Sequence, residues 1–301
     1  MSIVITATGA IDQIANALWV AKAGDVFEFV GTFPAGRGKM QAPAKVTFDF
    51  TRAVLDGAQY WQAVDGISIV GGDFRGGLRV DGAKNFSVTG AAFNGGGIFI
   101  LGGANLAFTG NSFVGGGGCA IGVQKTVGLL SDSNTFTAMA GDCHQFTGCS
   151  DVTVRRGRCS GGKPTPTAHP DYLQSTAIAG FAMTNWLIED NDVSGETQGL
   201  FLPGGVIGTA RRNRIDASLD NGVSVGSGTV LTIENNTLTG RARFIAYPGG
   251  SFIKAGGNTQ GGVAFDAPPP APVPAPQPRE ITLAPGETLI VHGAPLPAAA
   301  A

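Results

Sequence analysis

Short alternations of apolar and polar residues recur along most of the chain. Segments 105–113, 127–136, 151–159, 185–193 and 230–238 each combine such an alternation with a turn and a further apolar position. A period of two residues is typical of half-buried β-strands. A second set of alternating residues precedes these segments, at 77–80, 97–100, 120–123, 143–146, 172–175, 199–202 and 222–225. The pattern predicts two or three short strands in every repeat.

The length of the repeat follows from the spacing of an asparagine that recurs in the turn. It recurs at Asn111, Asn134, Asn191, Asn213, Asn236 and Asn258, with Ala91 and Gly157 at the equivalent positions of two further repeats. The successive spacings are 20, 23, 23, 34, 22, 23 and 22 residues. Two residues after each position lies an apolar residue: Phe93, Phe113, Phe136, Cys159, Val193, Ile215 and Leu238.

A repeat this short cannot bury its own apolar face and must stack on its neighbours. The sequence therefore predicts an all-β fold, a single-stranded parallel β-helix whose rungs lie about 4.8 Å apart. We expect the asparagines to be left-handed (αL) turn residues whose amides bond from rung to rung. The apolar residue two positions later is expected to fill the core.

The two ends differ from the repeats. Apolar residues in 10–23 recur at a helical period, which predicts a helix that caps the solenoid. Residues 263–279 are rich in proline and predict an extended linker. The predicted organisation is an N-terminal strand and capping helix over 1–23, the β-helix over 24–262, the linker over 263–279 and a short C-terminal β-hairpin or tail over 280–301.

Composition supports strands joined by tight turns. Of 301 residues 48 are glycine, which helices tolerate poorly, and 14% are charged. The net charge of −2 gives no electrostatic basis for binding nucleic acid or an anionic membrane. We find no transmembrane stretch and no signal-peptide pattern at the N-terminus.

The four cysteines, Cys119, Cys143, Cys149 and Cys159, match no zinc-binding spacing. We expect them to be reduced, buried thiols. A disulfide between Cys149 and Cys159 is the alternative.

The segment IANALWVAKAGDVFEFVGTF (14–33), followed by repeats with the Asn-x-Phe pattern, resembles the pectate-lyase-like right-handed β-helix superfamily. The resemblance covers about residues 5–262 and implies a right-handed solenoid. The superfamily includes polysaccharide lyases, hydrolases, epimerases and phage tailspikes. The chain lacks the basic and calcium-carboxylate pattern of a pectate lyase and the Asp-Pro-His-Glu motif of the alginate epimerases.

The 34-residue spacing marks the candidate site, because insertions in a solenoid usually project from its binding face. The extra residues lie near 160–171 and end at His169 and Asp171. When neighbouring rungs are aligned, Asp142 stacks on Asp171, and Gln145 stacks on Gln174, both glutamines pointing outward. His144 takes an inward position.

We predict four catalytic residues and five that bind substrate. The catalytic candidates are Asp171, His169, Asp142 and His144, and the binding candidates are Gln145, Gln174, Tyr172, Arg155 and Phe201. A pair of aspartates can act as general acid and as nucleophile or base in glycoside hydrolysis. His169 or Tyr172 could instead abstract a proton beside a uronate carboxylate, which is β-elimination. The structural alternatives are a turn-capping role for Asp142, a core histidine at 144 and a surface ladder of glutamines.

The sequence therefore predicts a polysaccharide-binding and polysaccharide-degrading protein of the tailspike or depolymerase type, with its glycan in a groove near residues 142–174. The alternatives are a non-catalytic virion fibre or spike and, less favoured, a cell-surface adhesin. The resemblance implies a virion or extracellular location and a homotrimer, or attachment to a larger assembly through the C-terminal segment. No cofactor is expected. Glu189, Asp190 and Asp192 offer oxygen ligands for calcium, although we favour a polar turn there.

Overall fold

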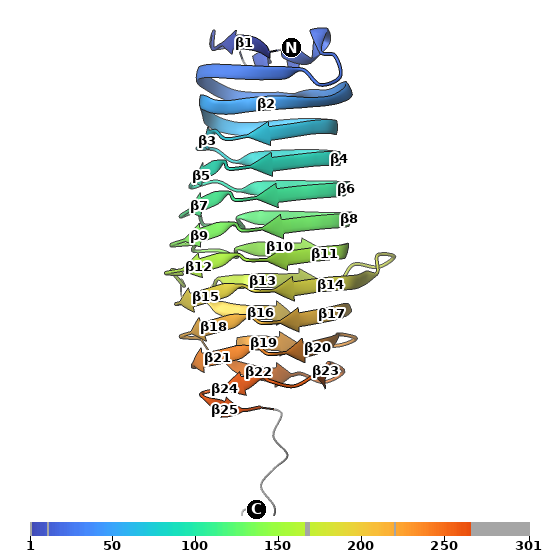
Figure 1. Cartoon of the computed structure of the whole chain (residues 1–301). Coiled ribbons are helices and arrows are strands. Elements are labelled where there is room, and N and C mark those ends of the chain that lie inside the picture. The colour runs from blue at the N-terminus through green and yellow to red at the C-terminus, as the bar shows by residue number, and fades with distance from the viewer. Residues whose placement is uncertain (1, 11, 166–168, 220, 266–301) are drawn as a thin grey trace, which may run out of the picture. The chain divides into compact units, whose positions relative to one another are not determined.

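The chain forms a right-handed parallel β-solenoid in the computed structural model (Figure 1). The structure describes residues 2–10, 12–165, 169–219 and 221–265, which belong to one compact unit. Most of the predicted linker over 263–279 and all of the tail over 280–301 lie outside these residues. No helix in the described part of the chain has the length and apolar character needed to cross a membrane.

The first rungs begin with β1 (Ser2–Thr6), α1 (Gln13–Asn16), η1 (Ala17–Val20) and the long strand β2 (Val26–Val70). β2 winds around the solenoid as one continuous ribbon (Figure 1). β1 pairs with β2 in parallel, so the N-terminal strand adds a further layer to the stack. The predicted capping helix over 10–23 is thus reduced to one α-helical turn and one 3-10 turn. Ile14 and Leu18 are buried, but Trp19 is 86% exposed and does not pack as the helical period predicted.

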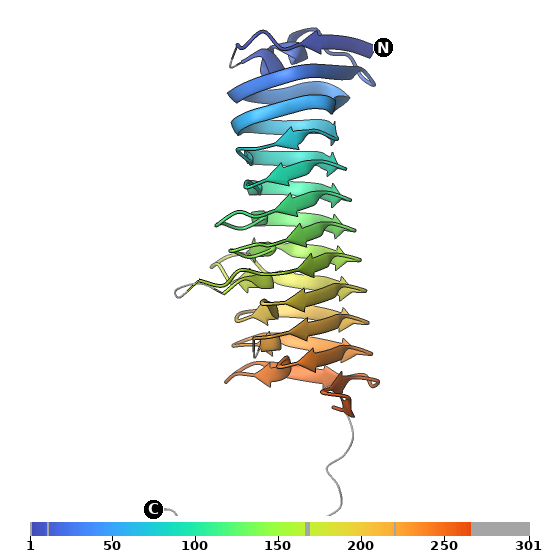
Figure 2. The same cartoon turned by 90° about the vertical axis from the view of Figure 1, so that its left-hand side faces the viewer.

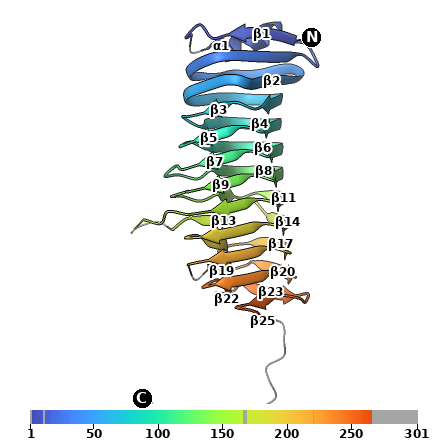
Figure 3. The same cartoon turned by 60° about the vertical axis from the view of Figure 1, so that its left-hand side comes forward.

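Every later rung contributes to three faces of the solenoid (Figures 1 and 3). Three long strands run through faces 1 and 2 together: β4 (Leu78–Thr89), β6 (Ile98–Thr109) and β8 (Ile121–Asp132). Face 1 continues with β10 (His144–Thr147), β13 (Asp171–Thr176), β16 (Gln198–Leu202), β19 (Asn221–Val225) and β22 (Arg243–Ala246). Face 2 continues with β11 (Ser150–Arg155), β14 (Met183–Glu189), β17 (Val206–Arg211), β20 (Val230–Glu234) and β23 (Ser251–Lys254).

Face 3 is built from the shortest strands. They are β3 (Asp73–Phe74), β5 (Ala92–Asn94), β7 (Ser112–Val114), β9 (Thr135–Thr137), β12 (Arg158–Ser160), β15 (Asp192–Gly195), β18 (Arg214–Ala217), β21 (Thr237–Gly240) and β24 (Thr259–Gln260). Successive strands of each face pair in parallel, as a stacked solenoid requires. β25 (Val263–Ala264) folds back against β24 as an antiparallel strand.

The predicted apolar column fills the core on face 3. The rings of Phe74, Phe93, Phe113 and Phe136 stack in order, with centroids 4.8, 4.8 and 5.2 Å apart. Cys159, Val193, Ile215 and Leu238 continue the column and are buried. These spacings match the separation of neighbouring strands.

The asparagine column is a buried hydrogen-bond ladder. The side-chain amide of Asn191 donates to Asn213, that of Asn213 to Asn236 and that of Asn236 to Asn258, at 2.8–3.0 Å. Each amide nitrogen also donates to a backbone carbonyl of the preceding rung, as Asn213 does to Ile188. Because a buried amide is stable only when paired, the ladder explains why the same residue recurs.

The αL conformation, however, lies one residue earlier than predicted. Ser133, Arg156, Asp190, Arg212 and Asn235 have positive φ, between 52° and 57°, whereas the ladder asparagines do not. The preceding residue makes the bend between faces 2 and 3, and this bend turns the following asparagine into the interior. A second αL residue, such as Gly82, Gly102 or Lys125, turns each rung between faces 1 and 2.

Tyr172 fills the gap that Gly157 leaves in the asparagine ladder between Asn134 and Asn191. At Gly157 the column has no side chain, and a Cβ there would lie 2.1 Å from the Tyr172 hydroxyl. That hydroxyl donates to Asn191 Oδ1 at 2.8 Å, in place of the missing amide. On the other side of the gap, the Asn134 amide donates to Ser131 Oγ, which lies 2.9 Å from His144 Nε2. The core at this rung is therefore polar, and hydrogen bonds connect Asn134, Ser131 and His144 on one side of the gap and Tyr172 and Asn191 on the other.

The expectation of reduced thiols is confirmed, with Cys143, Cys149 and Cys159 buried and Cys119 half-buried, and the alternative of a Cys149–Cys159 disulfide is wrong. All four thiols are free. Cys149 Sγ bonds to the Val123 carbonyl oxygen, while Cys159 Sγ lies 3.2 Å from Cys143 Sγ. The register explains this, because Cys149 lies just before face 2 and Cys159 lies on face 3.

Candidate functional site

The 34-residue spacing contains two long connections: residues 161–170 lead from face 3 to face 1 between β12 and β13, and residues 177–182 lead from face 1 to face 2 between β13 and β14. The prediction that the extra residues lie near 160–171 therefore holds for the first of them only. Figure 2 shows the connection between β12 and β13 projecting farther from the solenoid than the turns of the neighbouring rungs. Its base is held by Pro170, whose carbonyl accepts hydrogen bonds from Thr197 Oγ1 at 2.8 Å and from the Gln198 backbone at 2.9 Å. Gly162 packs closely against the Glu196 backbone, because a Cβ at Gly162 would lie 2.2 Å from the Glu196 carbonyl oxygen. His169, which precedes Pro170 in this connection, is exposed.

The loop ends at a pair of carboxyl groups on adjacent rungs, as the sequence predicts. The Asp171 backbone N–H donates to Asp142 Oδ1 at 3.0 Å. Asp142 is half-buried, whereas Asp171 is 3% exposed, and its Oδ1 has no hydrogen-bond partner among the described residues. A buried carboxyl oxygen without a partner costs free energy that a surface carboxylate does not.

Burial and proximity separate the proton affinities of the two groups. Burial, together with the charge of Asp142, raises the pKa of Asp171 to about 8. Burial also raises the pKa of Asp142, but the hydrogen bond from the Asp171 backbone and the charge of His169 oppose it. With a pKa of about 8, Asp171 holds its proton at neutral pH. Two neighbouring carboxyl groups with different proton affinities can divide the roles of acid and base.

A polar row continues from the pair along the same edge of face 1. Asp171 is in register with Gln198, and the Asn221 amide donates to Gln198 Oε1 at 3.0 Å. Next to this row is a hollow of about 350 Å³, lined by His169, Gln198, Phe201, Pro203, Asn221, Gly226, Ser227 and Tyr247. His169 lies beside both features: its charge lowers the pKa of Asp142, and its side chain lines the hollow.

The outward row of face 1 lies beside these groups. We use this name for Tyr60, Arg79, Phe99, Gly122, Gln145, Gln174, Phe201 and Ser224, which are in register from rung to rung. Gln145 Nε2 donates to Gln174 Oε1 at 3.0 Å, so the predicted ladder of glutamines forms. Phe201 follows it and contributes a ring to the hollow.

Tyr172 and His144 do not lie at this surface. The prediction that Tyr172 binds substrate is wrong, because Tyr172 is fully buried and its hydroxyl donates to Asn191. His144 is fully buried between Ser131 and the Tyr172 carbonyl oxygen, at 2.9 Å from each. Burial lowers the pKa of His144 to about 4, so it is neutral at pH 7. His144 is a core residue, because both of its ring nitrogens are engaged by partners inside the solenoid.

Arg155 lies on face 2 and not beside the carboxyl pair. It forms an ion pair with Asp132 at 3.0 Å, and Asp132 also pairs with Arg156. Glu189 and Asp190 pair with Arg212 in the same manner, two rungs on, and Asp192 lies 3.7 Å from Arg214. Within the described ranges no group of three acidic, histidine or cysteine residues is placed to hold a metal ion.

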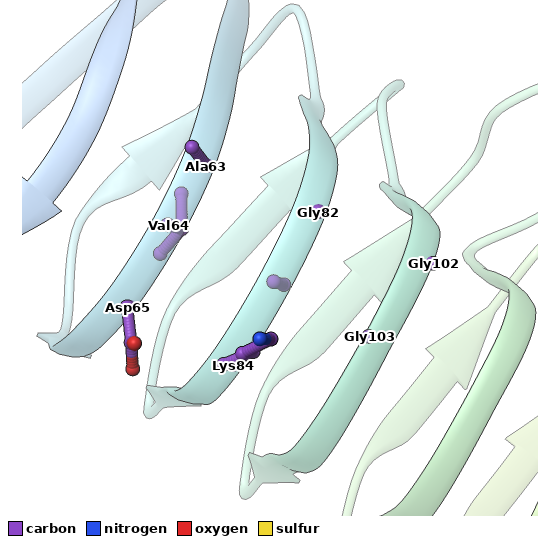
Figure 4. Close-up of a pocket in the computed structure, with 8 residues that line it drawn as sticks. Ala63, Val64, Asp65, Gly82, Lys84, Gly102 and Gly103 are labelled. Atoms are coloured by element: carbon purple, nitrogen blue, oxygen red, sulfur yellow. The ribbon is translucent and has the colours of Figure 1, made fainter.

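Another hollow of about 350 Å³ lies where β2, β4 and β6 turn from face 1 to face 2. Figure 4 shows Asp65 and Lys84 on neighbouring strands, with Gly82, Gly102 and Gly103 forming a smooth floor. Asp65 already accepts a hydrogen bond from Asn85. Since this hollow offers one acid and one base and no converging set of polar groups, we do not assign a site to it.

The sequence reasoning missed Gln198, Asn221 and Tyr247. The signal was present, because Asp142–Gln145 and Asp171–Gln174 have the same three-residue spacing as Gln198–Phe201 and Asn221–Ser224. Extending that alignment by two rungs would have predicted the whole polar row. Tyr247 lies beyond the last aligned repeat, and its hydroxyl approaches Asn221 Oδ1 at 3.5 Å.

Comparison with known proteins identifies the fold. A family model described as a right-handed β-helix region matches residues 96–260. No curated protein matches the chain.

Several solved structures have a similar solenoid. The Dettilon tailspike protein is 12% identical, with a TM-score of 0.54 over 86% of this chain and 68% of the tailspike. The receptor-binding protein of bacteriophage Det7, a podoviral tailspike in a myovirus, is 11% identical, with a TM-score of 0.50 over 94% of this chain and 73% of that protein. The A-module of the mannuronan C-5 epimerase AlgE4 from Azotobacter vinelandii is 12% identical, with a TM-score of 0.49 over 83% of this chain and 85% of the module. At these identities the likeness concerns the fold alone.

Proposed function

The chain belongs to the right-handed β-helix family, and we propose that it binds a polysaccharide along face 1 and hydrolyses it at Asp142 and Asp171. The observation that carries this proposal is the carboxyl pair, which lies on adjacent rungs beside the projecting loop, with Asp142 half-buried and the pKa of Asp171 raised to about 8. Glycoside hydrolysis needs two carboxyl groups in opposite protonation states.

The pair supplies both proton transfers of the reaction. As the bond between the anomeric carbon and the bridging oxygen breaks, the protonated carboxyl group gives its proton to that oxygen. Because the two groups lie on adjacent rungs, the carboxylate attacks the anomeric carbon as the nucleophile, and the first carboxyl group then takes a proton from the water that hydrolyses the glycosyl ester. The pair ends with one proton and one charge, as it began. Gln145, Gln174 and Gln198 offer amide groups for sugar hydroxyls, and Phe201 offers an aromatic ring.

Hydrolysis is favoured over β-elimination by the charges near the pair. Elimination beside a uronate needs a base and a cationic group for the carboxylate. In the described part of the chain, His169 is the only basic residue that influences the pKa of Asp142, and Arg155 is on face 2. The reaction product distinguishes the two chemistries, since elimination leaves an unsaturated sugar and hydrolysis does not.

The proposal is tested by incubating the protein with a panel of polysaccharides: polygalacturonate, alginate, dextran and xanthan. We expect new reducing ends from at least one of them, and their loss in Asp142→Asn and Asp171→Asn with the circular dichroism spectrum unchanged. Asp192→Asn, on face 3, is the matched control. Release of unsaturated products would replace hydrolysis by elimination. Binding without turnover would favour the alternative, a non-catalytic spike that recognises surface glycan.

The location and assembly follow from the likeness in fold to two tailspikes. We propose a virion or extracellular location and a homotrimer, or attachment to a larger particle. Sedimentation equilibrium of the full chain tests the trimer, and a monomer at micromolar concentration would exclude it.

A further inference from the structure

A further hollow lies on face 1, toward the N-terminal end of the outward row. It has a volume of about 270 Å³. Its lining residues are Tyr60, Arg79 and Phe99 of the outward row, together with Gln59, Leu78, Ala58, Gly76, Gly77 and Gly97. It shares no lining residue with the hollow beside His169, and Gly122, Gln145 and Gln174 lie between the two along the outward row.

The floor of this hollow consists of glycine where later rungs carry polar side chains. Three residues before the outward row, the first rungs have Gly76 and Gly96, whereas later rungs have Asp142, Asp171 and Gln198. A Cβ at Gly76 would lie 2.2 Å from the Ala58 nitrogen, so no larger residue fits. The face is therefore recessed here, and the backbone forms its surface.

The wall is a fixed stack of two rings and one guanidinium group. The guanidinium carbon of Arg79 lies 5.5 Å from the Tyr60 ring centroid and 5.6 Å from that of Phe99. Asp81 fixes Arg79 and Tyr60 in this stack, because it accepts hydrogen bonds from Arg79 Nε at 3.2 Å and from the Tyr60 hydroxyl at 2.6 Å. The Phe99 ring lies over Gly122, where a Cβ would be 2.8 Å from a ring carbon. Such pre-ordered aromatic groups lose little entropy when a ligand binds.

Gln59 is not a contact for a ligand in this hollow. It is in register with Leu78, and its side chain is 1% exposed and donates to the carbonyl oxygens of Pro34 and Gly57. The groups that a ligand can contact are therefore the rings of Tyr60 and Phe99 and the guanidinium group of Arg79. Aromatic rings beside a hydrogen-bond donor suit a sugar, whose ring has apolar faces and hydroxyl groups at its edge.

We propose that this hollow is a second sugar-binding subsite, which holds a ring of the same polysaccharide remote from the cleaved bond. The inference rests on the proposed function. Arg79 and Gln145 are three rungs apart, about 14 Å at the spacing of parallel strands. A chain that occupies both places lies parallel to the solenoid axis and is longer than a disaccharide. Binding should therefore be tighter for oligomers long enough to occupy both places.

The experiment measures binding apart from cleavage. Asp171→Asn, which cannot turn over substrate, is run by affinity electrophoresis through gels that contain polygalacturonate, alginate, dextran or xanthan. Phe99→Ala and Arg79→Ala are made in the same background. Phe181→Ala and Arg214→Ala are the matched controls, because both side chains are exposed and lie outside the outward row. Size-fractionated oligomers of the retarding polymer give the dependence on length.

We expect the polymer that retards Asp171→Asn to bind roughly tenfold more weakly to the Phe99 and Arg79 variants, as loss of a covered ring or its partner implies. The controls should not change. Affinity should rise with oligomer length until both subsites are spanned, and this rise should be absent in Phe99→Ala. Unchanged polymer binding by Phe99→Ala and Arg79→Ala overturns the second subsite and leaves the proposed function intact. If no polymer retards either the folded wild type or Asp171→Asn, both fail.

Discussion

The protonated state of Asp171 has a measurable effect on stability. In the folded chain this carboxyl group has a pKa of about 8, against an ordinary value of 3.8. The folded state thus binds the proton more tightly than the unfolded state does. The contribution to stability is fully present below about pH 4 and is lost as the pH rises toward 8, where the folded state must give up the proton or bury a charge.

The size of this effect follows from the two pKa values. One pKa unit corresponds to about 1.4 kcal/mol, so the wild type should lose up to about 6 kcal/mol of unfolding free energy between pH 4 and pH 8 through this group. Local relaxation of the carboxyl group reduces the figure, and we expect at least about 2 kcal/mol. Asparagine at position 171 has a similar shape and no charge, so Asp171→Asn should be the more stable protein at pH 8.

The assay is equilibrium urea unfolding, followed by far-ultraviolet circular dichroism at pH 4, 6 and 8. The quantity of interest is the difference in unfolding free energy between the wild type and Asp171→Asn. Asp192→Asn is the matched control, and its difference from the wild type should not change with pH in this way, because Asp192 is exposed on face 3 and away from the pair. If the difference between the wild type and Asp171→Asn does not change with pH, Asp171 is ionised at neutral pH, and the proton on which the proposed hydrolysis depends is absent.

Three further changes test the ladder and the core by urea unfolding at pH 6. Tyr172→Phe removes the hydroxyl donor to Asn191, and we expect a loss of about 1–2 kcal/mol; an unchanged midpoint would mean that the hydroxyl does not substitute for the missing amide. Asn213→Ala leaves the buried amide of Asn191 without its acceptor and should cost about 3 kcal/mol; a loss below about 1 kcal/mol would contradict a continuous ladder. Phe113→Ala empties a buried position in the ring stack and should cost about 3–5 kcal/mol, and a smaller effect would show that the neighbouring rings close the cavity.

The fold was predictable from the sequence because each rung contacts mainly its neighbours. A column such as Phe93, Phe113 and Phe136 needs only a constant spacing to be recognised, and stacking then fixes its direction. The αL residue was harder to place, because glycine, serine, arginine and asparagine all occupy it. Ser133 and Arg156 give no sign of positive φ in the sequence, although the structure places both there.

The site was only partly predictable, and Tyr172 shows why. Asp171, His169 and Gln174 were found because an insertion and an aligned spacing are properties of the chain. The position of Tyr172 depends instead on a missing side chain in the preceding rung, since its hydroxyl occupies the space that Gly157 leaves empty. The glycine in the asparagine column was visible, but a single sequence does not say which large residue fills such a gap. A long polar-tipped side chain placed one rung after a small residue in a buried polar column should therefore be considered a core residue before it is assigned to a binding surface.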